Sequence, residues 1–400
     1  MGQKQDSPEQ PGGKLHPNVV AAGWVSFFTD LGSEMIYPLL PIFITSNLGA
    51  SRTMLGLIEG ISEATPSIFK LFSGFISDRI RNRKWLIFLG YFISSSIKPL
   101  IGLSINAWQV LAIRFLDRVG KGIRGSPRDA LIADSTIPEK RGVAFGFQRA
   151  MDHLGALGGG LVAWILLTHF SLSLKQVILV SIFPGFFCLL TILFFIRELP
   201  NRPMNRFEPL KTKISYLPKE FWKLLVGITA FAIANSSDAF LILRSREMGI
   251  EVVWIPFVWS FLHFVKSVSC YFGGGLSDKF GPKLVVGLGW VLYSFVYLGF
   301  AVFNSSVAVV ILFGIYGVFF GMTEGSVKAW AANLVPVESR GTAFGFLGLA
   351  GGLMVFPASL LAGLLWDVYG SFIPLLMATI ISFASAIWLF FAVPNKAVSF

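Results

Sequence analysis

Apolar stretches of about twenty residues follow one another along nearly the whole sequence, with only short polar breaks between them. A stretch of that length can cross a bilayer as a helix. Hydrophobic residues make up 54% of the chain and charged residues only 14%, a balance that excludes an ordinary soluble domain. We therefore predict an all-α integral membrane protein embedded in a lipid bilayer.

The apolar stretches predict twelve transmembrane helices arranged as two six-helix bundles, at 20–196 and 221–394. A basic, proline-rich cytoplasmic linker at 197–220 joins the bundles. Residues 1–19 form a polar tail that we expect to be disordered, and 395–400 form a C-terminal tail. The predicted spans are 20–46, 53–77, 85–106, 108–133, 142–170, 175–196, 221–249, 252–277, 283–303, 306–333, 341–368 and 371–394.

Two sequence motifs occur once in each predicted bundle. GFISDRIRNRK at 74–84 recurs as GGLSDKFGPK at 274–283, and EKRGVAFGF at 139–147 recurs as ESRGTAFGF at 338–346. The copies keep the same order and the same side of the membrane. The chain is therefore predicted to be a duplication whose parallel repeats are related by an axis along the membrane normal.

The repeated loop and the twelve spans together resemble the major facilitator superfamily of secondary transporters. In that family the loop after the second helix carries a glycine, an acidic residue four positions on, and then basic residues. The resemblance implies a central cavity lined by helices one, four, seven and ten. We expect the matching loops to form cytoplasmic ion pairs that act as a conformational latch, although these basic residues also satisfy the positive-inside rule without one. The latch residues are Gly74, Asp78, Arg79, Arg83, Gly274, Asp278, Lys279 and Lys283.

The formal net charge of +11 follows membrane topology, so nucleic acid is not an expected partner. Most basic residues outside the spans fall on the side of the N-terminus. Segments on the other side hold only Arg52, Lys175, Arg244 and Arg246. This bias places both termini in the cytoplasm and the chain in the cytoplasmic (inner) membrane.

The fourth predicted span carries a charged stripe, because its ionic residues recur at steps of three and four and share one helix face. Charges at bilayer depth are costly and usually mark a substrate or ion pathway. The basic residues outnumber Asp117 and Asp129, which favours an anionic or zwitterionic small solute. In the alternative, these carboxylates together with Asp152 and Glu324 neutralise the stripe, which then serves as scaffold. The predicted substrate-binding residues of this span are Arg114, Arg118, Lys121, Arg124 and Arg128.

The second half offers further candidates for the same cavity. Asn235, Ser236, Ser237 and Asp238 make a polar break in the seventh span, and Glu324 and Lys328 lie one helical turn apart in the tenth. We assign Asp238, Glu324 and Lys328 to substrate binding. The sequence leaves open whether His263 and Lys266 join the cavity or pair with Asp238, and Lys98 before Pro99 is interpreted as a paired charge at a kink.

Acidic residues in the first half are candidates for proton coupling. Carboxylates four residues apart share a helix face, and each raises the proton affinity of the other when both are shielded from water. The alternative is an acidic rim or a set of partners for the basic stripe. The predicted proton-coupling residues are Asp30, Glu34, Glu59, Glu63, Asp152 and His153.

Other classes of protein find little support. The sequence has no nucleophile and base pairing, no HExxH metal motif and no GxxxxGK[ST] phosphate loop, so we predict no catalytic residues, cofactor or metal. Cys188 and Cys270 stand alone in apolar segments and imply no disulfide. We predict a monomeric, proton-coupled secondary transporter that works by alternating access. A multidrug efflux transporter is the alternative, ahead of a channel, a sensor or a membrane enzyme.

Overall fold

The computed structural model describes residues 15–79, 83–137, 140–199, 217–336 and 339–394, and these residues form helices and their connections without a β-strand. The first predicted bundle contains α1 (Pro17–Ile36), α2 (Leu40–Ile42), η1 (Phe43–Asn47), α3 (Arg52–Arg79), α4 (Arg83–Ile97), η2 (Lys98–Leu103), α5 (Ala107–Asp134), α6 (Arg141–Thr168), α7 (Leu174–Val180) and α8 (Ile182–Phe195). The second contains α10 (Lys219–Ala234), α11 (Ala239–Glu247), η4 (Val252–Trp254), α12 (Ile255–Phe280), α13 (Pro282–Val302), α14 (Ser306–Leu334), α15 (Arg340–Tyr369) and α16 (Phe372–Ala392).

Each predicted span coincides with a helical segment of the described chain to within about one turn. Within the described residues, ten helical segments are both long and apolar enough to cross a membrane. The helices α3 and α5 fall outside that set because ionic side chains interrupt both of them along their length. An all-helical membrane architecture is therefore confirmed, while the count of twelve stays a prediction.

Helix ends follow the local sequence. The side chain of Asn106 accepts a hydrogen bond from the backbone nitrogen of Gln109 at 3.0 Å and begins α5. Ser173 and Gln176 form a capping box at the start of α7. Gly281, at φ +85°, ends α12, and Pro282 starts α13 directly behind it.

The first and the seventh predicted spans are broken next to each other inside the protein. The predicted polar break in the seventh span is confirmed, because α10 ends at Ala234 and α11 begins at Ala239. In the first span, α1 ends at Ile36 and α2 begins at Leu40. The breaks lie side by side, since the hydroxyls of Tyr37 and Ser237 are 3.2 Å apart.

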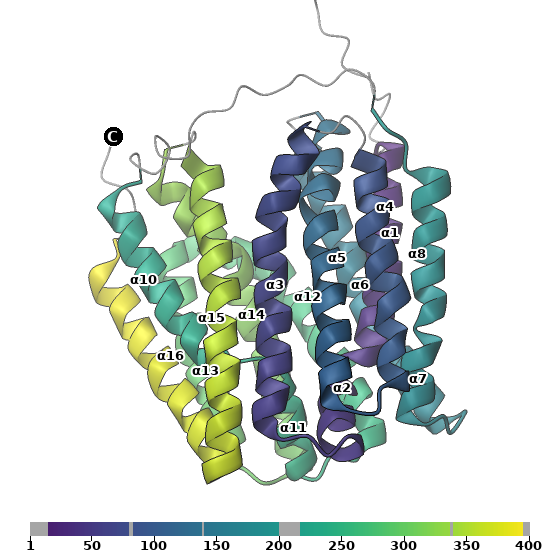
Figure 1. Ribbon diagram of the computed structural model, residues 1–400. Coiled ribbons are helices and arrows are strands. Elements are labelled where there is room, and N and C mark those ends of the chain that lie inside the picture. Colours follow the sequence, from purple (N-terminus) through teal and green to yellow (C-terminus); the bar gives the residue numbers. More distant parts are fainter. Residues whose placement is uncertain (1–14, 80–82, 138–139, 200–216, 337–338, 395–400) are drawn as a thin grey trace, which may run out of the picture.

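The helices gather into two groups (Figure 1), with α10, α13, α15 and α16 on one side and α1, α4, α5 and α8 on the other. Each group has its own apolar core. The core of the second group is dense in aromatic rings, with Phe231 stacked on Trp290 at 4.4 Å and Tyr293 on Tyr297 at 4.2 Å. Smaller apolar clusters around Tyr91 and Ala163 hold the first group together.

The start of α1, the end of α8, the start of α10 and the end of α16 lie at one end of the molecule (Figure 1), which we call the linker end. Asn18 at the start of α1 donates to the carbonyl of Arg197 at 2.9 Å, where the first group ends. Trp330 donates to the carbonyl of Pro394 at 3.1 Å at the same end of the second group.

Apart from the contact between the two helix breaks, the groups touch mainly through two helix pairs. α3 packs on α15, with no room for a side chain at Gly56 against the backbone of Ser359. α6 packs on α12, where Ser260 donates to the carbonyl of Leu157 at 3.0 Å and Trp164 meets Trp254. These contacts join the groups away from the linker end.

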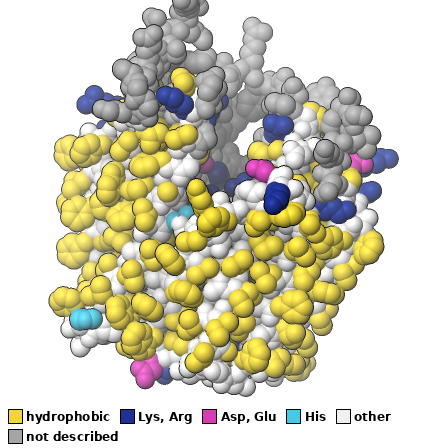
Figure 2. Space-filling view, turned by 180° about the vertical axis from the view of Figure 1, so that it is seen from behind, with side chains coloured by type: hydrophobic (Ala, Val, Ile, Leu, Met, Phe, Trp, Pro, Cys, Tyr) yellow, Lys and Arg dark blue, Asp and Glu magenta, His cyan; other side chains and the backbone are white. Residues whose placement is uncertain are grey.

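Toward the linker end the groups separate. A Cβ built at Gly146, Gly275, Gly345 or Gly348 would meet no atom within 4 Å. Figure 2 shows a hollow at this end with basic and acidic side chains around it, above a broad band of apolar surface. The outer surface is thus suited to lipid, while charged groups collect at the opening between the groups.

Candidate functional site

The predicted charged stripe of α5 faces inward, toward α1, α3 and α4. Close backbone contacts hold it there, because Gly120 lies against the backbone of Gly90 and Gly122 against Phe69 with no room for side chains. As a result Arg114, Asp117 and Arg124 are buried. The apolar residues Phe115 and Leu116 on the other face of α5 are exposed.

The deepest part of the stripe is an ion-pair network. Arg114 contacts a carboxylate oxygen of Glu59 at 2.9 Å, and Glu59 is 0% exposed. Arg114 also lies 3.9 Å from Asp117, whose other oxygen accepts a short hydrogen bond from Ser94. The second oxygen of Glu59 accepts from Ser237 at 3.1 Å, at the helix break of the other group. A fully buried carboxylate therefore joins the stripe to both groups of helices.

Arg118 sits one turn further along α5 and is shared between two carboxylates. Its guanidinium lies 3.5 Å from Glu63 and 3.7 Å from Asp117. Glu59 and Glu63, predicted as proton-coupling residues, therefore lie against the basic stripe as its partners. That position agrees with the alternative prediction, in which these two carboxylates are partners of the basic stripe.

The stripe opens onto a cavity enclosing about 490 Å³ that no protein atom fills, part of it continuous with solvent. Its walls come from α1, η2 and α5. The lining residues are Asp30, Ser33, Glu34, Ile36, Tyr37, Lys98, Arg114, Asp117, Arg118, Lys121 and Arg124. Four of the five stripe residues predicted to bind substrate thus share one cavity, together with two of the predicted proton-coupling residues.

Three of the lining cations form no ion pair within the described part of the chain. Arg124 stacks over the ring of Tyr91 at 4.0 Å, and its buried Nη1 has no hydrogen-bond partner there. Lys98 is buried and donates to the hydroxyl of Ser33 at 2.6 Å. Lys121 is exposed toward the opening. Because a buried donor without an acceptor is costly, this arrangement is suited to an anionic group from outside the protein.

Glu34 lines the cavity and touches the second group of helices. Its carboxylate accepts a hydrogen bond from Trp259 Nε1 at 2.8 Å and lies 3.8 Å from Nε2 of His263. Both ring nitrogens of His263 are buried and have no hydrogen-bond partner among the described residues. Glu34 and His263 therefore form a titratable pair that crosses between the two groups.

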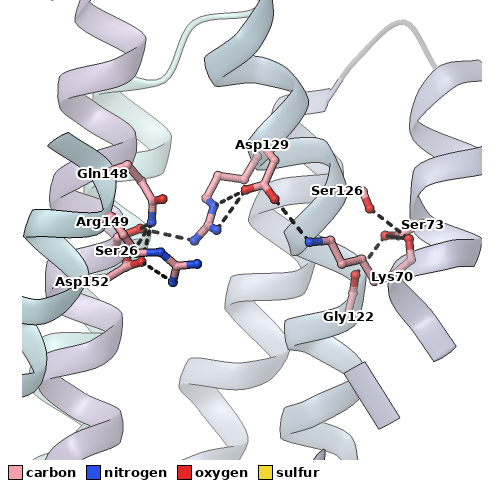
Figure 3. Close-up of polar contacts among 10 residues, drawn as sticks. Ser26, Lys70, Ser73, Gly122, Ser126, Asp129, Gln148, Arg149 and Asp152 are labelled. Carbon is pink, nitrogen blue, oxygen red and sulfur yellow. Dashed lines mark hydrogen bonds and ion pairs between the residues drawn. The ribbon is translucent and has the colours of Figure 1, made fainter. Parts of the chain in front are cut away.

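A second polar network runs across the first group nearer the linker end (Figure 3). Arg128 contacts Asp129 at 2.9 Å, and Asp129 lies 3.4 Å from Lys70 on α3. On the other side Gln148 donates to Ser26 and to Asp152, both at 2.8 Å. Arg149 lies 3.5 Å from Asp152. Arg128 and Asp152 do not line the cavity, and their contacts tie α1, α3, α5 and α6 together.

The predicted substrate-binding residues of the second group are separate from this cavity as well. Asp238 accepts a hydrogen bond from Tyr316 at 2.7 Å beside the broken seventh span. Glu324 lies 3.6 Å from Lys266, whose ammonium sits 4.0 Å from the ring of Phe320. Lys328 is exposed one turn beyond Glu324, and His153 is half-buried on α6.

The structure describes only some of the side chains of the predicted latch. The side chains of Asp78 and Arg79 lie outside the described residues, and Gly74 and Gly274 are helical positions in α3 and α12. Arg83 contacts Asp134, at the end of α5, at 2.6 Å. In the second copy the exposed Asp278 and Lys279 precede the turn that leads to Lys283. The latch stays a prediction.

Sequence reasoning missed several residues around the cavity. Ser33, Tyr37, Tyr91 and Trp259 carry no charge, so nothing in their spacing separates them from ordinary membrane-helix residues. Lys98 did carry a signal, because a lysine within an apolar span needs a reason. The interpretation as a paired charge is wrong, since it forms no ion pair within the described chain.

Comparison with known proteins gives one consistent family. The family model of the Major Facilitator Superfamily matches residues 22–359 and 263–399. An uncharacterized MFS-type transporter of Methanocaldococcus jannaschii is 37% identical over 385 residues, covering 92% of this chain and 95% of its own. The multidrug resistance protein MdtG of Salmonella arizonae is 28% identical over 274 residues, covering 65% and 66%.

The fold is similar to those of solved transporter structures. A bacterial homologue of the human lysosomal transporter Spinster, solved in an inward-facing and occupied conformation, superposes with a TM-score of 0.79 at 17% sequence identity. The match covers 95% of this chain and 97% of that one. The family model and the fold are those of transporters.

Proposed function

The chain belongs to the major facilitator superfamily, and we propose that it is a secondary active transporter for a small organic solute with an anionic group. The solute is an anion or a zwitterion. It binds in the cavity between α1, η2 and α5 and crosses the inner membrane as the two groups of helices rock around it. The linker end faces the cytoplasm in this proposal, following the positive-inside bias.

Arg124 carries the proposal. Its guanidinium is buried and stacked on Tyr91, it lines the cavity, and one of its nitrogens has no acceptor in the described chain. Lys98 and Lys121 add two more cations that form no ion pair there, against Asp30 and Glu34 on the same walls. A carboxylate or phosphate placed among the three cations would satisfy these donors with charge-assisted hydrogen bonds.

Proton coupling is part of the proposal, and its residues are Glu34 and His263. Glu34 shares the cavity with the cations and lies 3.8 Å from the imidazole on the other group of helices. Loss or gain of a proton at this pair changes both the charge of the cavity and the attraction between the two groups. Solute binding and rocking would thereby respond to the same proton.

Efflux of amphipathic drugs is the second candidate function, favoured by the relatives named MdtG. The ring of Tyr37 lines the cavity and lies 5.1 Å from Trp259, so aromatic surface stands next to the charged groups. A cationic dye would bind against these rings and the carboxylates of Asp30 and Glu34. Removal of Arg124 should therefore weaken ligand binding under the first function and strengthen it under the second.

The test is Arg124→Gln. Purified protein is first screened by thermal shift against carboxylates, sugar phosphates, amino acids and cationic dyes, and the dissociation constant of the best ligand is measured by titration. We expect an anionic ligand whose dissociation constant rises about tenfold or more in Arg124→Gln, the scale of losing about 1.5–3 kcal/mol from a charged hydrogen bond.

Lys175→Gln is the control, because this exposed lysine on α7 does not line the cavity and its removal changes the net charge equally. The control should keep the affinity of the parent protein. Unchanged binding of the anion by a folded Arg124→Gln variant would remove Arg124 from the site. A dye as best ligand, bound more tightly after the substitution, would favour the efflux function instead.

A further inference from the structure

The start of α3 is unusual in how its backbone donors are satisfied. The first four N–H groups of a helix have no acceptor within the helix and need one from outside. Ser51 supplies the acceptor for Met54, whose N–H donates to the Ser51 hydroxyl at 3.1 Å, while the Ser51 carbonyl accepts the first regular helix bond, from Leu55 at 3.1 Å. The first two N–H groups, of Arg52 and Thr53, depend on a residue from the other group of helices.

That residue is Asp367, near the end of α15. Its Oδ1 accepts from the backbone nitrogen of Arg52 at 3.0 Å, and its Oδ2 accepts from the backbone nitrogen of Thr53 at 2.8 Å. Oδ2 also accepts from the hydroxyl of Thr53 at 2.6 Å. A carboxylate at a helix N-terminus is favoured by the helix dipole as well as by these bonds. Asp367 thus completes the cap of a helix that belongs to the opposite half.

This cap stands where α3 and α15 are in contact, at the end opposite the linker. Gly363 packs on the backbone of Arg52, Gly56 on Ser359, and Gly352 on Ser67, all without room for a side chain. Further toward the linker end the small-residue face of α15 continues, but a Cβ at Gly348 would meet no atom within 4 Å. The two helices are therefore closed together at the Asp367 end and apart at the linker end.

We propose that Asp367 is a conformational latch which stabilises the state closed at the end opposite the linker. If the groups rock apart at that end, as the proposed function requires, Arg52 and Thr53 lose their acceptors and Asp367 loses three donors. The bonds made by Ser51 lie within α3 and its connection, so they persist in both states. The latch biases the equilibrium only through interactions that exist in one state. The proposal rests on alternating access and is independent of the solute.

The experiment measures how often that end opens. Ser359 is 0% exposed and lies behind the cap in the contact between α3 and α15. Ser359→Cys, in a Cys270→Ser background, provides a thiol that reacts with a maleimide only when the contact opens. When closing is faster than labelling, the labelling rate is proportional to the open population, so even a rare open state is measured. The protein without Ser359→Cys gives the background rate.

We expect Asp367→Asn to raise the labelling rate about tenfold or more, because a charge-assisted cap is lost only from the closed state. Thr53→Val, which removes one of the three donors, should raise the rate by less. Ser51→Ala removes a cap bond from the same helix end in both states and should leave the rate unchanged. An unchanged rate in folded Asp367→Asn, or an equal rise in Ser51→Ala, would overturn the latch.

The measurement is made without ligand, so it separates this proposal from the proposed function. Failure of Arg124→Gln to weaken anion binding would leave the Asp367 result standing. Conversely, if the Asp367 carboxylate merely caps α3, Asp367→Asn should lower the melting temperature without faster labelling. That result would contradict the latch and would say nothing against the proposed binding site.

Discussion

Arg114→Gln should destabilise the protein more than any other single substitution in the charged stripe of α5. The substitution leaves Glu59, 0% exposed, without its guanidinium partner. Among the described residues, the hydroxyl of Ser237 is then its one remaining donor. Breaking a buried ion pair from one side costs about 3–5 kcal/mol, because an uncompensated charge stays behind. The free energy of unfolding is measured by titration with SDS in mixed micelles.

Two further variants decide whether the buried pair is the cause. Glu59→Gln/Arg114→Gln removes both charges together and should cost much less than the sum of the single substitutions, since no charge is left unpaired. Arg149→Gln breaks an ion pair whose arginine side chain is 55% exposed and should cost less than about 1 kcal/mol. Additive costs in the double variant would show that Glu59 and Arg114 are not coupled.

Two glycines of α6 should respond to alanine in opposite directions. A Cβ at Gly155 would collide with the backbone carbonyl of Phe27 on α1, so Gly155→Ala requires the two helices to move apart. Overpacking of this kind costs about 1–3 kcal/mol or more. Gly146 has no atom within 4 Å of a Cβ, and Gly146→Ala gains up to about 1 kcal/mol from helix propensity.

The two variants can be compared directly, because both change a glycine of α6 to alanine and both are measured by the same method. Unfolding free energies in mixed micelles should fall for Gly155→Ala and hold or rise for Gly146→Ala. If both variants lost stability equally, the close contact between α1 and α6 would not be the source, and a general intolerance of α6 to alanine would explain the result.

The helical architecture was predictable because the bilayer imposes a length on every span, and the sequence shows that length repeatedly. The duplicated motifs added the division into halves. The break at residues 235–238 was also visible, since consecutive polar residues in an apolar stretch favour other partners than lipid. The break before α2 was not predicted, although Pro38 and Pro41 stand beside it and proline interrupts helices.

The candidate site was predictable only as far as periodicity reaches. Steps of three and four place Arg114, Arg118 and Arg124 on one face of α5, and the structure confirms that this face points inward. Periodicity does not show which cations have partners, because the partners depend on which faces α3 and α4 turn toward α5. Glu59 reaches Arg114, whereas Arg124 meets the ring of Tyr91. The free and the neutralised cations therefore look alike in the sequence.

The walls of the cavity have a consequence for how such a protein can change. All the residues that line it fall between Asp30 and Arg124, within the first of the two predicted repeats. Gene duplication starts with two equal copies, so under the proposed function the two copies have taken different roles, with solute binding in the first. New solute preferences would arise by mutation of the first copy alone. The second copy is free to drift, provided that it preserves the surfaces of α12 and α15 against which the first copy moves. It must also keep Ser237, Trp259 and His263, which contact Glu59 and Glu34.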